Sequence, residues 1–383
     1  MTTQASTISA TSDVLAEVRG QVGFLTLNRP KAINALSLQM VRDLMVHLLR
    51  WKEDAAIKAV AIRGSSKEGV FGHFCAGGDI RFLHAAGSTG NPELEDFFTE
   101  EYALNHLIFN YPKPYIAFMD GIVMGGGMGI SQGASLRLVT ERTKMAMPET
   151  IIGLFPDVGG GYFLSRCPGH VGEWLALTGE TIGAGEAIAY ELADAFIPAA
   201  QQQAAWDGLA TQHFADGDAV HVYLKQFTQH ASLEIAQSPD DVAHIHRIFG
   251  LPTVTAIMQA LESDSSTWSQ NTAAALRKRS PLMLHVVLEQ IRRARSMDVA
   301  DDLRMERDMV RHCFYLRPGQ SETVEGIRAL AVDKDHAPRW NPSRIEEVDE
   351  ALWRAFFVSP WPAHAHPLRD LQDAGVVQQQ ESK

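Results

Sequence analysis

Two glycine clusters in this chain each stand between an apolar run and a helical pattern. Cys75–Ile80 comes after the apolar run Ala59–Arg63, and Gly125–Gly127 comes after Tyr115–Met119. Glycines let the backbone approach a ligand closely, and the first turn of a helix directs its N–H groups outward. Apolar runs that alternate with helices in this way are typical of an α/β fold, in which helices pack on a sheet.

The spacing of apolar residues predicts the elements of this fold. Strands are expected at 14–19 and 22–27, joined as a hairpin, and at 59–63, 115–119, 135–140 and 144–147. Helices are expected at 38–52 with Ser37 as N-cap, from near Asp79, at 93–109, and after a turn at 121–129. From Gly179 onward the pattern is mostly helical, most clearly at 282–295 and 299–313. We therefore predict a core over 14–200 and a helical C-terminal region over 201–370 that covers the site.

Composition and charge exclude several classes of protein. The chain has 383 residues and a formal net charge of −12, which argues against a nucleic-acid binder because such proteins need a cationic face. Its three scattered cysteines argue against a disulfide framework or a zinc site. The sequence contains no apolar run long enough for a membrane helix, and Met1–Ser12 lacks the basic residues of a targeting segment. We expect a cytoplasmic protein that binds neither nucleic acid nor a membrane.

Two carboxylates, Glu149 and Asp157, lie in the otherwise uncharged segment Met147–Phe163. Each directly follows a proline, and the triplet Gly159–Gly161 comes after them. Carboxylates in an apolar, glycine-rich setting are costly to keep and commonly have a chemical role. Taken singly, each is explained as well by a place at a helix N-terminus or in a turn. Their combination with two glycine loops in one α/β segment favours acid–base catalysis.

The two glycine loops could together bind a developing negative charge. Each could aim one backbone N–H at a single oxygen, which would form an oxyanion hole for an enolate or a tetrahedral intermediate. The alternative for Cys75–Ile80 is a plain turn from strand to helix. The alternative for the second cluster is close helix packing, which fits Gly129 and Gly133, four residues apart, better than it fits Gly125–Gly127.

Four motifs in a fixed order resemble the crotonase, or enoyl-CoA hydratase/isomerase, superfamily. They are 27–36 (Leu-Asn-Arg-Pro-Lys-Ala-Ile-Asn-Ala-Leu), Cys75–Ile80, Asp120-Gly121 with Gly125–Gly127, and Pro148-Glu149. The resemblance implies a ClpP-like fold of repeated ββα units that binds an acyl-CoA thioester. It also implies that the backbone N–H groups of Gly78 and Gly126 hold the thioester oxygen.

Further motifs resemble one branch of that superfamily, the 3-hydroxyisobutyryl-CoA hydrolases. Enoyl-CoA hydratases carry a second catalytic glutamate just after the glycine triplet, where this chain has Gly129. The hydrolase-like segments are Met147–Phe163, Ser280-Pro281 and 325–342. This resemblance implies hydrolysis of 3-hydroxyisobutyryl-CoA in valine catabolism, with Glu149 as the main carboxylate and Asp157 as its assistant.

The resemblance leaves the chemical route and two other functions open. Glu149 could attack the thioester to form an anhydride, or it could act as a general base on water. An enoyl-CoA hydratase or isomerase on the same fold is the nearest alternative, and a non-catalytic acyl-CoA-binding protein is another.

The resemblance also implies a set of residues that contact the substrate. These positions are Arg29, Lys31, Ala32, Ala76, Gly77, Asp79, Ile80, Arg81 and Gly125. For the cations among them, ordinary surface charge is the alternative interpretation. No metal and no cofactor is expected, since coenzyme A is part of the substrate, and a homo-oligomer is possible.

Overall fold

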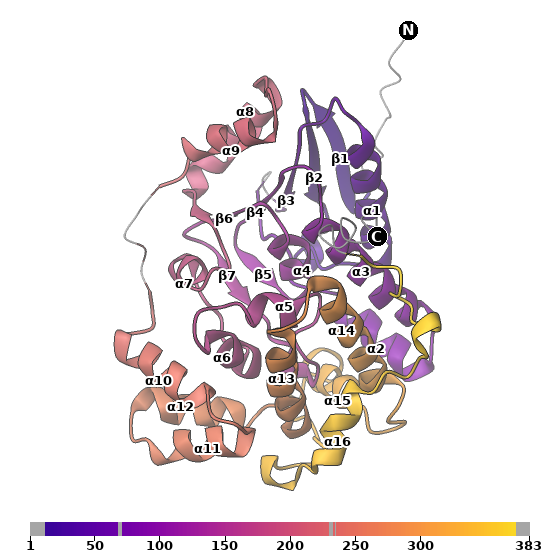
Figure 1. The fold of residues 1–383 in the computed structure, drawn as a ribbon, viewed down its shortest axis with the longest axis vertical. Helices are drawn as coiled ribbons and strands as arrows, with labels where there is room; N and C mark the ends of the chain where they lie inside the picture. The colour runs from indigo at the N-terminus through magenta and orange to yellow at the C-terminus, as the bar shows by residue number, and fades with distance from the viewer. Residues whose placement is uncertain (1–11, 68–70, 230–232, 234, 373–383) are drawn as a thin grey trace, which may run out of the picture.

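A six-stranded sheet forms the centre of the structure, a computed structural model that describes residues 12–67, 71–229, 233 and 235–372 (Figure 1). Its strand order is β1-β2-β3-β4-β6-β8; β1 and β2 are antiparallel, and the other neighbours are parallel. A second sheet pairs β5 with β7 in parallel. The strands are β1 Val14–Arg19, β2 Val22–Leu27, β3 Ala59–Gly64, β4 Tyr115–Met119, β5 Ile122–Met124, β6 Leu136–Val139, β7 Lys144–Ala146 and β8 Ala195–Phe196.

All six predicted strands are found, but one segment that was predicted as a turn contains a further strand. The hairpin of β1 and β2 has the predicted bounds, and β2, β3 and β4 are buried along their whole length. The segment 121–129 was predicted as a turn, yet it contains the strand β5. Three residues are too few to show a period-two pattern. The strand forms because its backbone pairs with β7, a partner that lies about twenty residues later.

Sixteen α-helices are found in the described residues, and the helices predicted to start at 38, near Asp79 and at 93 begin there. Ser37 accepts a hydrogen bond from Met40 N at 3.3 Å, and Asp79 accepts one from Phe82 N at 3.3 Å. The helices are α1 Leu38–Glu53, α2 Ile80–Thr89, α3 Glu93–Phe109, α4 Gly126–Gln132, α5 Gly160–Leu164, α6 Val171–Thr178, α7 Ala184–Ala189, α8 Gln202–Thr211, α9 Gly217–Lys225, α10 Pro239–Phe249, α11 Val254–Ser263, α12 Thr267–Leu276, α13 Pro281–Ala294, α14 Val299–Phe314, α15 Glu322–Ile327 and α16 Glu350–Arg354.

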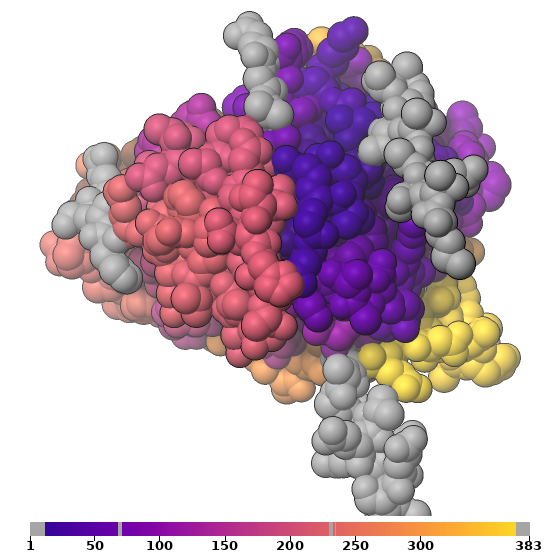
Figure 2. All heavy atoms as spheres, turned by 90° about the horizontal axis from the view of Figure 1, so that it is seen from above, coloured from indigo at the N-terminus to yellow at the C-terminus, as the bar shows by residue number. Residues whose placement is uncertain are grey.

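Helices cover both faces of the main sheet. On one face, Phe24 and Phe118 pack against Trp206 of α8, with ring centroids 4.8 and 5.4 Å away. Figure 2 shows this part of the chain, in pink, directly beside the indigo N-terminal strands. The other face belongs to a larger core that includes Ile62 and Met119. The sheet is therefore a buried middle layer, which explains its nearly continuous apolar strands.

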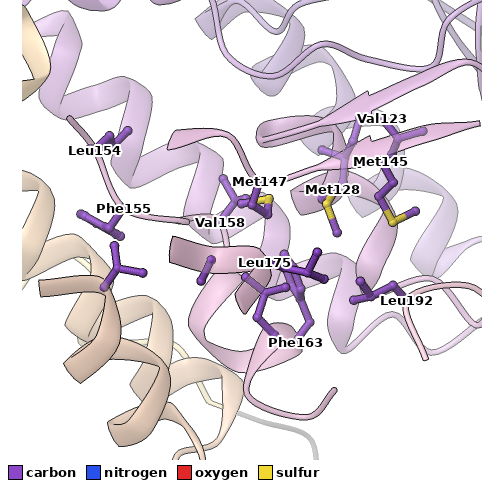
Figure 3. Packing of buried hydrophobic residues seen from close by; sticks show 14 of the residues in the cluster. Val123, Met128, Met145, Met147, Leu154, Phe155, Val158, Phe163, Leu175 and Leu192 are labelled. Carbon is purple, nitrogen blue, oxygen red and sulfur yellow. The ribbon is translucent and has the colours of Figure 1, made fainter. Parts of the chain in front are cut away.

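Helices α13, α14 and α15 pack on the segment that carries Glu149 and Asp157. Helix α13 lies against α5 and α6, α14 lies against α3 and α5, and α15 lies against α2 and the 3₁₀ helix Glu149–Ile152. Figure 3 shows Phe155 on the side of the buried cluster that faces these C-terminal helices. Parts of the chain far apart in sequence thus meet around one segment.

Candidate active site

A cavity of about 200 Å³ brings together the four residues predicted to be catalytic. Gly78, Gly126, Glu149 and Asp157 all line it. The other lining residues are Ala76, Gly77, Ile80, Leu83, Phe97, Phe98, Glu101, Gly125, Pro148, Ile151, Ile152, Leu154, Val158 and Leu330. The cavity is therefore an apolar chamber with three carboxyl groups and two glycine loops in its wall.

The N–H groups of Gly78 and Gly126 lie close to each other at this wall. A Cβ built on Gly126 would lie 3.4 Å from Gly78 N. Leu36 fixes the first loop on both sides, since Leu36 N donates to Gly77 O at 2.8 Å and Asp79 N donates to Leu36 O at 3.0 Å. Gly126 opens α4, and the first N–H groups of a helix have no acceptor within it. Two such donors on one oxygen form an oxyanion hole.

Glu149 begins a 3₁₀ helix, Glu149–Ile152, and its carboxylate lies against the second glycine loop. A Cβ built on Gly125 would lie 2.8 Å from Glu149 Oε1, so any other residue at position 125 would push the carboxylate out of its present place. Glu149 Oε2 is buried and has no hydrogen-bond partner among the described residues. Burial, followed by the nearby charges of Asp157 and Glu101, raises the pKa of Glu149 well above its usual value. A buried oxygen without a partner at a cavity wall is free to contact a ligand.

Asp157 is held by a tyrosine from α3. Tyr102 Oη donates to Asp157 Oδ2 at 2.8 Å, and both side chains are buried. Burial raises the pKa of Asp157 to about 6, while the hydrogen bond from Tyr102 acts in the opposite direction because it favours the charged form. Asp157 is thus poised to change its charge near neutral pH.

Glu101 is a third carboxyl group in the cavity, and the sequence analysis missed it. It lies on α3, is 2% exposed, and its Oε1 has no partner among the described residues. A Cβ built on Gly126 would lie 2.7 Å from this oxygen. Burial and the charge of Asp157 raise its pKa well above its usual value. Helical spacing could have revealed it, since Glu101 is the charged residue on the same face as Leu94 and Phe98.

Gly129, the position that lacks the hydratase glutamate, has no room for any side chain. A Cβ built there would lie 2.6 Å from Val158 Cβ and 2.9 Å from Asn105 Nδ2. A Cβ on Gly133 would likewise lie 2.7 Å from Phe109 N. These contacts agree with the close-packing interpretation of Gly129 and Gly133. The second glutamate of the cavity comes from α3 instead.

The residues predicted to contact coenzyme A divide into two groups. Ala76, Gly77, Ile80 and Gly125 line the cavity, whereas Arg29, Lys31, Ala32, Asp79 and Arg81 do not.

In the second group, two residues bind each other. Arg29 Nη2 lies 2.7 Å from Asp79 Oδ2, and Arg29 Nη1 donates to Ala35 O at 3.1 Å. Lys31 and Arg81 are exposed. Roles of the second group in coenzyme A binding stay predictions.

The described residues contain neither a candidate metal site nor a helix that could span a membrane. No group of three or more His, Cys, Asp or Glu side chains in that part of the chain could hold a metal ion. No helix in it is long and apolar enough to cross a membrane.

Comparison with known proteins gives the family. A family profile described as enoyl-CoA hydratase/isomerase matches residues 22–357. A probable 3-hydroxyisobutyryl-CoA hydrolase of Arabidopsis thaliana is 37% identical over 91% of this chain and 92% of its own length. A protein of Danio rerio named mitochondrial 3-hydroxyisobutyryl-CoA hydrolase is 38% identical over 89% of this chain and 88% of its own.

Solved structures agree with this result. One, described as a carnitinyl-CoA dehydratase from Mycobacterium thermoresistibile, is 36% identical with a TM-score of 0.83 and covers 94% of this chain and 100% of its own. Another, described as an enoyl-CoA hydratase from Rhodobacter sphaeroides, is 35% identical with a TM-score of 0.80. It covers 91% of this chain and 98% of its own length. These likenesses confirm the predicted fold class. The chain belongs to the enoyl-CoA hydratase/isomerase, or crotonase, family.

Proposed function

We propose that this protein hydrolyses the thioester of a short 3-hydroxyacyl-CoA, foremost 3-hydroxyisobutyryl-CoA. The proposal rests on one observation: Glu149 lines the same cavity as Gly78 and Gly126, whose N–H groups can bind the thioester oxygen. Position 129, where a hydratase has its second glutamate, is a glycine. The names of the relatives, which share more than a third of their residues with this chain, support the same substrate.

The cavity suits thioester cleavage because the oxyanion donors and a carboxylate lie at one wall. The thioester oxygen binds the N–H groups of Gly78 and Gly126, where negative charge develops in the transition state. One donor of this kind contributes about 3–4 kcal/mol to the transition state. Glu149 then reacts in its ionised form: it attacks the carbonyl carbon or takes a proton from an attacking water, and its raised pKa makes that carboxylate a stronger base.

Both routes end in the same products. If Glu149 attacks, the C–S bond breaks, the thiolate of coenzyme A leaves and takes up a proton, and water opens the resulting anhydride. If Glu149 acts as a base, water adds directly and the C–S bond breaks from the tetrahedral intermediate. Free carboxylic acid, free thiol and unchanged Glu149 result in each case. A single turnover in water labelled with heavy oxygen distinguishes the two routes, because only the anhydride route can place the label in the Glu149 side chain.

In this proposal, Glu101 and Asp157 bind the 3-hydroxyl group of the substrate. Both line the cavity, and their oxygens are the polar groups there besides Glu149 and the backbone. Burial keeps the pKa of Glu101 high, so this group can donate a hydrogen bond, while Asp157 accepts one when ionised. An acyl group without a 3-hydroxyl would leave these buried groups unpaired, which is costly.

The size of the cavity fits a short acyl chain. Apolar side chains from Leu83, Phe97, Phe98 and Leu330 narrow it to about 200 Å³. The 3-hydroxypropionyl group lacks one methyl, which in an apolar pocket discriminates by only about 1–3 kcal/mol. We therefore expect that 3-hydroxypropionyl-CoA is also hydrolysed, more slowly.

Hydration of enoyl-CoA is the second candidate, because the solved relatives are described as a hydratase and a dehydratase. The experiment that separates the two is a panel of short acyl-CoAs, assayed for free thiol and for loss of the enoyl double bond. Thiol release from 3-hydroxyisobutyryl-CoA without hydration of crotonyl-CoA supports the hydrolase. Absence of thiol release from every short 3-hydroxyacyl-CoA rejects it.

Three finer statements belong to the same proposal. A role in valine degradation follows from the substrate and is tested by growth on valine after deletion of the gene. Cytoplasmic location stays a prediction for cell fractionation, since the Danio rerio relative is named mitochondrial. A homo-oligomer stays a prediction for sedimentation analysis.

A further inference from the structure

The backbone turn that carries Asp157 is strained. Val158, a β-branched residue, has a φ of +59°, and Gly159 follows with a φ of +84°. A positive φ is a genuine outlier for a β-branched side chain, and it persists only where the surroundings enforce it. Asp157 O accepts a hydrogen bond from Gly160 N at 2.8 Å, which closes the turn. Something outside the turn must hold it in this conformation.

Glu306 of α14 holds the turn with both of its carboxylate oxygens. Gly159 N donates to Glu306 Oε2 at 2.8 Å, and Gly161 N donates to Glu306 Oε1 at 2.9 Å. Glu306 is fully buried and does not line the cavity. One side chain thus binds the residues on either side of Gly160.

Gln290 of α13 supports this arrangement from a second direction. Its side-chain amide donates to Pro156 O at 2.6 Å and to Glu306 Oε1 at 3.2 Å. Gln290 is also fully buried. Asp157 therefore lies between two backbone anchors, Pro156 on its N-terminal side and Gly159 on its C-terminal side.

We propose that Glu306 is a positioning residue for Asp157: it enforces the strained turn at Val158 and so fixes the Asp157 carboxylate in the cavity. The role of Asp157 in the reaction rests on the proposed function, but the positioning by Glu306 does not. An apolar residue in place of Glu306 would leave two buried N–H groups without acceptors. A carboxylate is needed because two donors must be satisfied at once.

Glu306→Gln tests the proposal with little change of shape. Glutamine has one acceptor oxygen, so its amide NH₂ group would face one of the two backbone N–H groups. We expect kcat for thioester hydrolysis to fall by about 10- to 100-fold with KM changed by less than about 3-fold, because a small misplacement of a catalytic group lowers the rate more than it lowers binding. Amide hydrogen exchange at Gly159 and Gly161 should become faster.

Glu186→Gln is the matched control. Glu186 of α7 is also a buried glutamate whose two oxygens accept from two backbone N–H groups, those of Gly183 and Ala236, but it does not line the cavity. The same loss of one acceptor oxygen is therefore made away from Asp157. We expect kcat within about 3-fold of the wild type and unchanged exchange at Gly159 and Gly161.

Val158→Gly separates positioning from general stability, since glycine adopts a positive φ without strain. In this background the turn needs less enforcement, so adding Glu306→Gln should lower kcat by a smaller factor than it does in the wild type. If Glu306→Gln alone does not fold, the comparison of Val158→Gly with the double variant still decides. Equal exchange at Gly159 and Gly161 in those two folded variants would overturn the proposal, as would an equal loss of kcat in both backgrounds.

The proposed function can fail without affecting this inference. If the wild type hydrolyses no acyl-CoA, the exchange rates of Gly159 and Gly161 still report whether Glu306 holds the turn. Faster exchange in Glu306→Gln but not in Glu186→Gln then supports positioning alone. Unchanged exchange in Glu306→Gln rejects it.

Discussion

Val158 lies over Gly129 so closely that a Cβ at position 129 would be 2.6 Å from Val158 Cβ. Val158 belongs to the turn 157–160, called here the Asp157 turn, and Gly129 belongs to helix α4, which also supplies Gly126. Figure 3 shows Val158 among the labelled side chains of the buried cluster, with Met128, the neighbour of Gly129. The absence of a glutamate at position 129 is therefore tied to the place of Asp157, because the turn fills the space that a side chain would need.

Gly129→Ala should destabilise the protein and lower its activity. The added Cβ meets the backbone-proximal part of Val158, so the Asp157 turn must shift; overpacking of this kind costs about 1–3 kcal/mol. Urea unfolding measures the loss. Gly319→Ala is the control, because Gly319 has a φ of +70° but open space around it, and only the smaller backbone penalty of about 1 kcal/mol applies. Equal losses at both positions would contradict the steric argument.

Glu149→Gln should abolish thioester hydrolysis and keep binding. Glutamine can neither attack the thioester nor take a proton from water, so we expect kcat to fall by at least about 10³-fold. The amide is nearly isosteric, and the N–H groups of Gly78 and Gly126 remain. Calorimetry with a non-hydrolysable acyl-CoA analogue should give a Kd within about 5-fold of the wild type. Retained hydrolysis would show that Glu149 is not the main catalytic group.

Tyr102→Phe should move the acid limb of the pH–rate profile to higher pH. The Tyr102 hydroxyl stabilises ionised Asp157 through the 2.8 Å hydrogen bond, and its loss raises the pKa of Asp157 further above about 6. A hydrogen bond to a charged group contributes about 1.5–3 kcal/mol, which corresponds to about 1–2 pH units. Tyr111→Phe is the control, since Tyr111 donates at the same distance to Leu48 O. An acid limb that does not move in Tyr102→Phe would exclude Asp157 as the group that titrates.

Asp157→Asn should stabilise the protein more at alkaline than at acidic pH. Because burial raises the pKa of Asp157 from 3.8 to about 6, the folded state binds more protons than the unfolded state between these values. Stability from this group is present below pH 3.8 and is lost as the pH rises through about 6. Asparagine carries no charge and can still accept from Tyr102.

The difference between variant and wild type in free energy of unfolding should therefore grow by about 1–3 kcal/mol between about pH 4 and about pH 8. Urea titrations at several pH values measure it. A difference that stays constant over this range would show that Asp157 is not titrating in the folded protein.

Leu330→Ala should relax the acyl preference. Leu330 lies on the π-helical segment Arg328–Val332 and reaches the cavity, although it is 37% exposed. Removing its side chain makes room for a longer acyl chain. We expect kcat/KM for a 3-hydroxyacyl-CoA with two more carbons to rise by about 10-fold relative to 3-hydroxyisobutyryl-CoA. Val332→Ala is the control, since Val332 is exposed and does not line the cavity.

The sequence predicted the parts of the fold and site that local pattern determines. Ser37 and Asp79 mark helix starts because capping depends on the neighbouring residues alone. Glu149 and Asp157 were found because charges are conspicuous in a segment of apolar residues and glycines. Their meeting with Gly78 and Gly126 in one cavity was inferred from a family resemblance, and the structure places the four residues there.

The residues that were not predicted were missed for two different reasons. Glu101 stands next to Glu100 in a helix rich in acidic residues, and only the helical face on which it lies distinguishes the two. Leu330 and Glu306 act on a segment about 150 or more residues earlier, and no periodicity in their own helices indicates that partner. Such contacts follow from tertiary packing, which a single sequence does not specify at this level.

The hydrogen bond from Gly159 to Glu306 joins residues 147 positions apart. A ribosome makes the sheet, both glycine loops and Glu149 well before it reaches α14. Until then the N–H groups of Gly159 and Gly161 have no carboxylate to bind, and the turn at Val158 is free to relax. We therefore expect that a nascent chain does not fix the Asp157 carboxylate in place until α14 has been synthesised.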